Sequence, residues 1–172
     1  DRGAPRRRAR GVAVITVRPA TLEDWQTLAI FIEESNIEQR LFGVPDWTRA
    51  HLEAIHAAIS ANLGGVYLAF DGQKPVGMTA MLSFPAMPVG YVEGITTYVH
   101  PSYRRTKVAH ELGVAAREFH REQGRDAIHG SVYLANEASV KRCMAEGAEV
   151  VGWLLKYDIS KHKETVDVSP DA

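Results

Sequence analysis

The sequence predicts an α/β fold in which one mixed sheet carries helices on its faces. Short runs rich in β-branched residues alternate with longer segments whose apolar residues recur at helical spacing. Residues 71–75, with the sequence DGQKP, separate two of the short runs and are typical of a hairpin turn. Along the chain the elements follow the order βααβββαβαβ, which predicts helices packed in layers against one sheet.

The first strand and helix are predicted from a β-branched run and a helix cap. Residues 12–17 form this run, which is expected to end before Pro19. Thr21 and Asp24 have the spacing of a cap at the start of a helix. The apolar residues of this helix are Trp25, Leu28, Ala29 and Ile32.

A second helix and a hairpin complete the first half of the chain. Residues 36–47 are interpreted as a loop that leads to the helix. Its apolar face is formed by Leu52, Ile55, Ile59 and Leu63. It is expected to end at Gly64 and Gly65, because glycine commonly terminates helices. The hairpin strands follow at residues 66–70 and 76–84.

The second half of the chain is predicted to hold three strands and two helices. A strand at residues 91–99 leads into a helix that Gly124 closes. The apolar face of this helix comprises Val108, Leu112, Ala115, Ala116 and Phe119. A further strand is expected at residues 127–134, a short helix at residues 136–147 and a final strand at residues 153–159.

Length and composition predict one folded domain with two tails. The chain has 172 residues, and its body, residues 12–160, is long enough to bury one core. Residues 1–11 are rich in arginine and residues 161–172 contain little to bury, so both are expected to be disordered. The net charge is −1 and the arginine excess is confined to the first tail, which does not favour nucleic acid as a partner.

Cysteine, apolar and histidine patterns exclude several classes of protein. The single cysteine, Cys143, excludes an internal disulfide framework and favours a reducing compartment. No apolar run reaches the roughly 18 residues that a membrane span needs. We therefore expect a cytoplasmic protein without membrane contact. The segment HELGV has Val114 where a zinc-binding helix needs its second histidine, and no metal site is predicted.

Residues 100–112, with the sequence HPSYRRTKVAHEL, form the segment with the clearest chemistry. They connect a predicted strand directly to a predicted helix, and the start of a helix offers unpaired backbone N–H groups to an anion. Arg104, Arg105 and Lys107 add three cations around this point. A phosphate-binding loop and an exposed basic helix start explain this pattern equally well.

Two motifs resemble the GNAT superfamily of N-acetyltransferases. The family's coenzyme loop has the pattern V-x-P-x-Y-R-G-x-G-x-G/A, and the matching residues are Val99, Pro101, Tyr103, Arg104, Val108, Ala109 and Leu112. A second family pattern, N-x-x-A-x-x-L-Y-x-K-x-G-F, is matched at Asn136 and Gly147, with Ser139 as the small residue. The resemblance covers most of residues 12–159. It implies a twisted, mostly antiparallel sheet of six to seven strands with about four helices.

The resemblance also implies which residues contact acetyl-CoA. Backbone groups of Thr97 and Val99 would bond to the pantetheine arm, and the Val99 N–H would polarise the thioester carbonyl. Asn136 would reach the pantetheine or an ordered water, while a plain helix cap explains this residue as well. The full set of implied coenzyme-binding residues is Thr97, Tyr98, Val99, Arg104, Arg105, Thr106, Lys107, Val108, Ala109 and Asn136.

The chain departs from the family pattern at four positions. Arg105 and Lys107 replace glycines of the loop, Cys143 replaces a tyrosine and Ala148 replaces a phenylalanine. Glycine lets backbone N–H groups approach phosphates closely, so these side chains must project away or weaken binding. Lysine is not forbidden in a first helical turn with ordinary right-handed angles. We therefore expect coenzyme binding that is retained but altered.

Glu93 and Cys143 are the candidate catalytic residues. Glu93 lies on the same predicted strand as Thr97 and Val99 at positions of equal parity, so it is expected to face the same cleft and act as general base. A solvent-facing glutamate is the competing interpretation. Cys143 occupies the family's general-acid position, and its thiol could protonate the leaving thiolate. Core packing is the competing explanation for this small side chain.

The predicted function is acetyl transfer from acetyl-CoA to a primary amine by direct attack in a ternary complex. The acceptor is a small-molecule or peptide amine. Glu33, Glu34 and Glu38 favour a cationic acceptor, although solvated helix charge explains them too. The alternative is a GNAT-like binding module that has lost efficient catalysis and contacts a protein or nucleic acid through its basic tail. The sequence leaves the oligomeric state open, a homodimer included.

Overall fold

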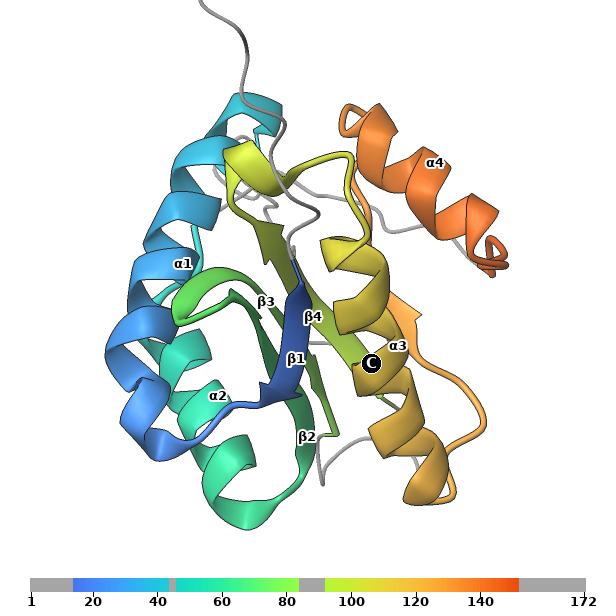
Figure 1. The fold of residues 1–172 in the computed structure, drawn as a ribbon. Helices are drawn as coiled ribbons and strands as arrows, with labels where there is room; N and C mark the ends of the chain where they lie inside the picture. Colours follow the sequence, from blue (N-terminus) through green and yellow to red (C-terminus); the bar gives the residue numbers. More distant parts are fainter. Residues whose placement is uncertain (1–13, 44–45, 84–91, 152–172) are drawn as a thin grey trace, which may run out of the picture.

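A five-stranded sheet forms the centre of the molecule (Figure 1). The computed structural model describes residues 14–43, 46–83 and 92–151. The strands lie side by side in chain order, with β1–β4 antiparallel and β5 parallel to β4. Their bounds are β1 Ile15–Pro19, β2 Gly64–Asp71, β3 Lys74–Leu82, β4 Glu93–Val99 and β5 His129–Gly130.

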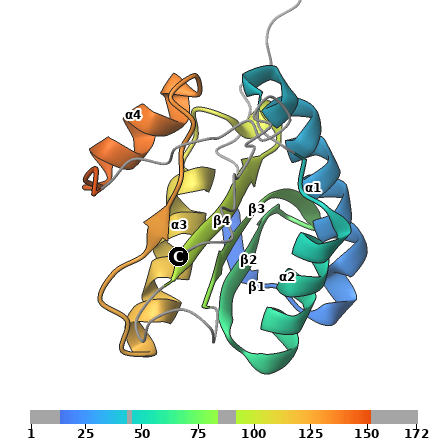
Figure 2. The same ribbon diagram turned by 180° about the vertical axis from the view of Figure 1, so that it is seen from behind.

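Helices cover both faces of this sheet. α1 and α2 lie on one face and α3 lies on the other, whereas α4 stands apart beside α3 (Figures 1 and 2). The bounds are α1 Trp25–Gln39, α2 Arg49–Ala61, α3 Val108–Glu122 and α4 Glu137–Ala145. Short 3-10 turns are η1 Leu22–Asp24, η2 Arg40–Phe42 and η3 Pro101–Tyr103. The predicted element order is confirmed, while the final strand at residues 153–159 and both tails lie outside the described residues.

The predicted loop at residues 36–47 is partly wrong, because α1 continues to Gln39 and η2 follows it. The side chain of Asn36 supplies the reason. Its Oδ1 accepts from the Trp47 backbone N–H at 2.7 Å and its Nδ2 donates to the Trp47 carbonyl at 3.1 Å. This buried amide ties the helix to the segment before α2, so a polar residue that looked like loop sequence is satisfied inside a helix.

Further element boundaries differ from the prediction, and β1 extends through Pro19 rather than ending before it. α2 ends at Ala61, and Asn62 rather than a glycine adopts the left-handed cap conformation. Gly64 and Gly65 instead begin β2, where a Cβ on Gly65 would lie 3.1 Å from the Ala116 carbonyl oxygen. The strand predicted at residues 127–134 is reduced to the two residues of β5 in the described part of the chain.

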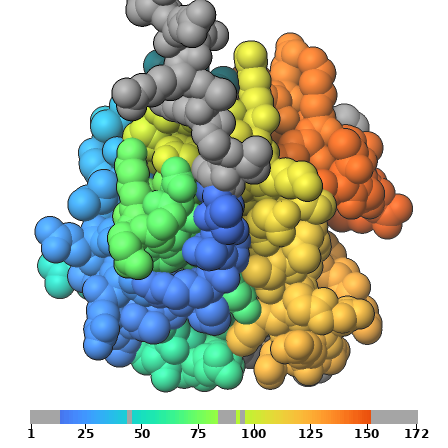
Figure 3. Space-filling view, in the orientation of Figure 1, coloured from blue at the N-terminus to red at the C-terminus, as the bar shows by residue number. Residues whose placement is uncertain are grey.

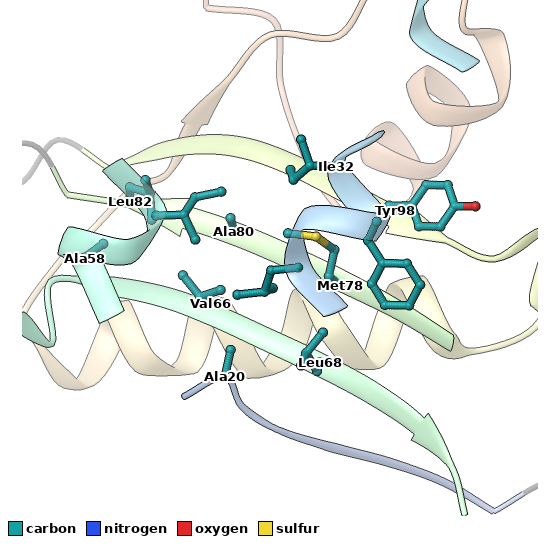
Figure 4. Close-up of a cluster of buried hydrophobic side chains, with 12 residues drawn as sticks. Ala20, Ile32, Ala58, Val66, Leu68, Met78, Ala80, Leu82 and Tyr98 are labelled. Carbon is teal, nitrogen blue, oxygen red and sulfur yellow. The ribbon is translucent and has the colours of Figure 1, made fainter. Parts of the chain in front are cut away.

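The main core lies between the sheet and the pair α1 and α2. Val66, Leu68, Met78 and Ala80 point from the strands into it (Figure 4), and Leu28 of α1 is also fully buried within it. A smaller cluster on the opposite face joins the sheet to α3 through Val108 and Leu112. Burial of apolar side chains on both faces stabilises the sheet and sets the position of α3.

A close approach between β3 and α3 positions the start of that helix. A Cβ on Gly77 would lie 2.8 Å from the Tyr98 carbonyl oxygen, 3.2 Å from Val108 and 3.3 Å from Leu112. At the other end of α3, buried His120 has its Nε2 atom 2.7 Å from the Met81 carbonyl oxygen. The same Nε2 atom lies 3.3 Å from the Gly65 nitrogen of β2, and burial lowers the pKa of the imidazole. α3 is thus held against the sheet at both ends.

Candidate active site

Within the described residues, the edge of β4 that faces β5 is open over most of its length. The two strands pair only at Glu93 with His129 and at Gly94 with Gly130, and beyond these pairs no described strand covers the edge. On the opposite side, the His100 N–H donates to the Val76 carbonyl oxygen at 2.9 Å. Open strand edges present rows of unpaired backbone N–H and C=O groups.

The hydrogen-bond alternation of β4 shows which groups reach this open edge. Because His100 bonds to β3, Tyr98 and Thr96 also direct their backbone polar groups to β3. Thr97 and Val99 therefore direct theirs to the open edge. The Val99 carbonyl is consistent with this direction, since it accepts from Arg104 Nε at 3.1 Å rather than from β3. The Val99 N–H and both backbone groups of Thr97 remain directed at the open edge.

A β-bulge in β4 overturns the parity argument for Glu93. The register pairs Ala80 with Thr96 but Met81 with Gly94, so Ile95 is the extra residue. Beyond the bulge, Glu93 pairs with Leu82, whose side chain lies in the core on the α1 and α2 face.

The half-buried Glu93 side chain therefore lies on the α1 and α2 face of β4. The side chain of Thr97 lies on the opposite face, where its hydroxyl is 2.9 Å from the Thr79 hydroxyl. Equal parity in the sequence did not translate into a shared face. The role of Glu93 as general base stays a prediction.

The loop between β4 and α3 adopts a glycine-like conformation without glycine. Arg105 has a φ of +59°, in the left-handed region that favours glycine. Lys107 has φ −77° and ψ −6°, ordinary right-handed angles at the position before α3. Of the two positions where the family has glycine, Arg105 therefore has a strained backbone and Lys107 does not. The sequence had suggested Lys107 as the residue that could hinder coenzyme binding.

The side chains of Arg104 and Thr106 hold this loop. Arg104 donates to the Val99 carbonyl oxygen and forms an ion pair with Glu38 near the end of α1. The Thr106 hydroxyl donates to the Tyr103 carbonyl oxygen and accepts from the Val108 N–H at 3.4 Å. The predicted use of the Arg104 guanidinium for phosphate is thus in competition with two bonds inside the protein.

Arg105 and Lys107 are the cations of the loop that remain available to bind a ligand. Both side chains are exposed, and neither forms an ion pair with any residue that the structure describes. They flank the start of α3. The first N–H groups of this helix, that of Ala109 included, have no i−4 carbonyl partner within the helix. Val108 is fully buried and its N–H already donates to the Thr106 hydroxyl, so the N–H groups after it are the ones left for a ligand.

We expect Arg105→Gly to be more stable than Arg105→Ala. Both variants remove the guanidinium, but only glycine relieves the left-handed strain, which amounts to about 1 kcal/mol for a residue with a Cβ. Thermal unfolding should give a melting temperature about 2–4 °C higher for the glycine variant. At a right-handed position the order would be reversed, so a more stable alanine variant would contradict the left-handed conformation of Arg105.

α4 carries the remaining predicted residues. Asn136 caps this helix, since its side chain accepts from the Ser139 N–H at 3.2 Å. Cys143 is half-buried, and its Sγ atom lies 3.6 Å from Nη2 of Arg142. Asn136 therefore has the structural role that the sequence already offered as an alternative. Among the described residues, no hydrogen bond or ion pair joins Cys143 to the open edge of β4.

α4 is tied to α3 by an ion pair. The carboxylate of Glu146, one residue beyond α4, lies 2.9 Å from Arg117 Nη1, and His110 Nδ1 of α3 is 3.7 Å from the same carboxylate. In the space-filling view α4 (orange) projects from the body beside α3 (Figure 3). The start of α3 and α4 thus border the same side of the molecule.

Tyr98, one of the residues that the resemblance assigned to coenzyme binding, has its side chain buried between α1 and β4. Tyr98 is only 4% exposed and packs on Phe31, with ring centroids 5.4 Å apart. Burial and the nearby Glu34 carboxylate raise the pKa of its hydroxyl, so it keeps its proton. Glu34 and Glu38, which the sequence had suggested for a cationic acceptor, are four residues apart on α1 and so share one helix face, with Glu34 beside Tyr98 and Glu38 paired with Arg104.

The comparisons with known proteins identify the family. The family model described as "Acetyltransferase (GNAT) family" matches residues 25–154. The chain belongs to the GNAT acetyltransferase family. This confirms the predicted resemblance. No curated protein sequence matches the chain.

Solved GNAT structures share the fold of this chain. The aminoglycoside acetyltransferase AAC(6')-Iy, in complex with a bisubstrate analog, is 19% identical with a TM-score of 0.64, and the match covers 84% of this chain and 97% of that one. PaiA N-acetyltransferase from Thermoplasma acidophilum, in complex with coenzyme A, is 16% identical with a TM-score of 0.64, covering 80% and 91%. A predicted acetyltransferase with acetyl-CoA from Clostridium acetobutylicum is 14% identical with a TM-score of 0.68, covering 87% and 99%.

Membrane spans and metal clusters are absent from the described part of this GNAT protein. Among residues 14–43, 46–83 and 92–151, no helix has the length and apolar character needed to cross a bilayer. The same residues contain no group of three His, Cys, Asp or Glu side chains arranged to hold a metal ion.

Proposed function

We propose that this chain is an acetyl-CoA-dependent N-acetyltransferase that moves an acetyl group to a primary amine by direct attack in a ternary complex. Membership of the GNAT family supports acetyl transfer. One observation carries the proposal: the open edge of β4 leads directly to the loop and helix start at which Arg105 and Lys107 are exposed. The strand edge and the helix start follow each other along the chain, so one long coenzyme could contact the edge with its pantetheine arm and the helix start with its diphosphate.

The described residues fit coenzyme A in two places. The amide groups of a pantetheine arm could extend the sheet by bonding to the backbone of Thr97 and to the Val99 N–H. A diphosphate could accept from the first N–H groups of α3 while Arg105 and Lys107 neutralise its charge. The solved structure of PaiA contains coenzyme A, and the solved C. acetobutylicum structure contains acetyl-CoA, which supports this assignment.

The proposed reaction needs three groups from the protein. Acetyl-CoA supplies the thioester carbonyl that the amine nitrogen attacks, with cleavage of the C–S bond. The Val99 N–H would donate to the carbonyl oxygen as negative charge develops there. Glu93 would accept the proton of the attacking amine through a water molecule. Cys143 would supply the proton that the departing thiolate takes up.

The acceptor is proposed to be a small-molecule or peptide amine. The solved relative AAC(6')-Iy was crystallised with an analog that joins coenzyme A to an acetylated neamine derivative. In this chain Glu33 is exposed on α1, while Glu38 is paired with Arg104. Negative charge on this side of the molecule would favour a cationic amine such as an aminoglycoside or a polyamine.

Location and assembly are the broader parts of the proposal. The half-buried thiol of Cys143, the chain's single cysteine, suits a reducing compartment such as the cytoplasm. A monomer and a homodimer are both compatible with the proposed reaction.

Binding and turnover assays test this function directly. Acetyl-CoA should raise the melting temperature, because a ligand that binds the folded state stabilises it. A panel of aminoglycosides, polyamines and lysine peptides should then release free coenzyme thiol, which a thiol reagent measures. No thermal shift and no calorimetric heat would refute the transferase. Coenzyme binding without turnover, together with salt-sensitive DNA binding lost on removal of residues 1–11, would favour the binding module.

We expect Cys143→Ala to lower kcat by about tenfold if the thiol protonates the leaving thiolate, since general acids contribute at least that much. The KM for acetyl-CoA should change little, because the side chain would act on the departing sulfur. Cys143→Ser, which keeps a weaker donor, is the matched variant. Unchanged kcat in the alanine variant would assign Cys143 to packing alone.

A further inference from the structure

The loop before α3 keeps a strained conformation without glycine, so its neighbours must hold it. Arg105 has a left-handed φ of +59°. Non-glycine residues persist in this region only where the surrounding structure fixes them. The contacts on either side of Arg105 therefore decide where the following N–H groups point.

Two side chains provide these contacts. After Arg105, the Thr106 hydroxyl bridges the Tyr103 carbonyl oxygen and the Val108 N–H, all within the loop and helix start. Before it, Arg104 bonds to the Val99 carbonyl oxygen at 3.1 Å and to the Glu38 carboxylate. Glu38 belongs to α1, 66 residues before Arg104 in the chain, whereas the other partners lie in β4, the loop or the start of α3.

The ion pair acts on the end of β4 through a single planar group. The guanidinium of Arg104 presents Nη2 to Glu38 and Nε to Val99, so fixing one end of the group orients the other. The N–H of Val99 faces the open edge of the strand, as the backbone groups of Thr97 do. Through Arg104, Glu38 therefore influences both the strained residue Arg105 and Val99 at the end of that edge.

We propose that Glu38 is a positioning residue for coenzyme binding, which it supports by holding Arg104 against the Val99 carbonyl. This inference rests on the proposed function, because it assigns the loop and the edge to coenzyme A. The pair is half-exposed, with 45% of the Arg104 side chain and 34% of the Glu38 side chain accessible. Its contribution is consequently moderate and sensitive to salt.

Calorimetric titration of coenzyme A into the full chain tests the proposal. Glu38→Gln keeps the shape of the side chain and removes the charge. We expect the Kd for coenzyme A to rise about three- to fivefold at low ionic strength, as a partly exposed ion pair allows. Near 1 M salt the variant and the native chain should converge, since the pair is screened. The KM for acetyl-CoA should rise in parallel while kcat stays within about twofold.

Two matched variants separate positioning from general stability. Glu53→Gln removes an exposed ion pair with Arg49 on α2 and should leave the Kd unchanged. In an Arg104→Gln background, Glu38→Gln should add no further loss, because the partner is gone. The role of Glu38 would be overturned if Glu38→Gln had the Kd of the native chain. It would also be overturned if Glu38→Gln weakened coenzyme binding equally in the native chain and in the Arg104→Gln background.

The possible outcomes also distinguish this inference from the proposed function. If the native chain gives no heat with coenzyme A, both fail together. If the native chain binds coenzyme A and Glu38→Gln binds equally well, only the positioning role fails. A raised KM for the amine acceptor with an unchanged coenzyme Kd would place Glu38 in acceptor recognition and would likewise overturn it.

Discussion

Glu93→Gln should lower kcat about 100-fold at saturating acetyl-CoA and acceptor amine. The variant keeps the size of the side chain but cannot accept a proton, and a positioned general base contributes at least this factor. The half-buried side chain lies on the α1 and α2 face of β4, next to the bulge where the strand begins to separate from β5. An amine that approaches the open edge from this face could reach it through one water molecule.

The same variant should bind coenzyme A normally in a calorimetric titration. The backbone of Thr97 and Val99, which would hold the coenzyme, is unchanged by a substitution before the bulge. Glu53→Gln, on an exposed face of α2, is the control for loss of a carboxylate elsewhere. A decrease in kcat of less than about threefold would mean that Glu93 is a solvated strand residue, as the sequence also allowed.

Gly77→Ala should lower the free energy of unfolding by about 2 kcal/mol, a typical effect of overpacking a filled site. The added Cβ would lie 2.8 Å from the Tyr98 carbonyl oxygen, and a backbone atom in a sheet cannot move aside cheaply. It would also press on Val108 and Leu112, the residues that seat α3 on the sheet. Thermal unfolding should show a melting temperature about 4–8 °C lower.

Gly113→Ala is the matched control for this effect. Its added Cβ would meet the end of the flexible Arg117 side chain, at 3.0 Å from Nη1, rather than a backbone atom. Within α3 the change from glycine to alanine favours the helix by about 1 kcal/mol. The control should therefore be as stable as the native chain or more stable. Equal losses in both variants would contradict the close packing assigned to Gly77.

The loop before α3 shows how far sequence reasoning reaches at a site. The sequence showed that two glycines of the family pattern are replaced, but it did not show what each replacement does to the backbone. The sequence pointed to Lys107 as the obstacle, whereas the backbone strain is at Arg105. It also assigned Arg104 to phosphate, yet its guanidinium is bonded to Glu38 and Val99. Backbone angles and long-range partners are absent from a local pattern, which is why neither feature could be predicted from it.

Glu93 provides a second case of the same kind. Counting positions along an uninterrupted strand places Glu93, Thr97 and Val99 on one face. The extra residue at Ile95 reverses that assignment for everything before it. Bulges arise from the pairing with a neighbouring strand, here β3, so the alternation of one segment cannot locate them.

The sequence by itself determined the element order, the family and the loop at which coenzyme A is proposed to bind. These follow from periodicity, turn residues and two short motifs, all of which depend on residues close together in the chain. Tertiary structure alone decided that no described strand covers most of one edge of β4, that Arg105 is strained and that Glu38 of α1 holds Arg104. Each of these depends on how segments far apart in sequence pack together, and the free energy of that packing is shared among many residues rather than encoded in any one of them.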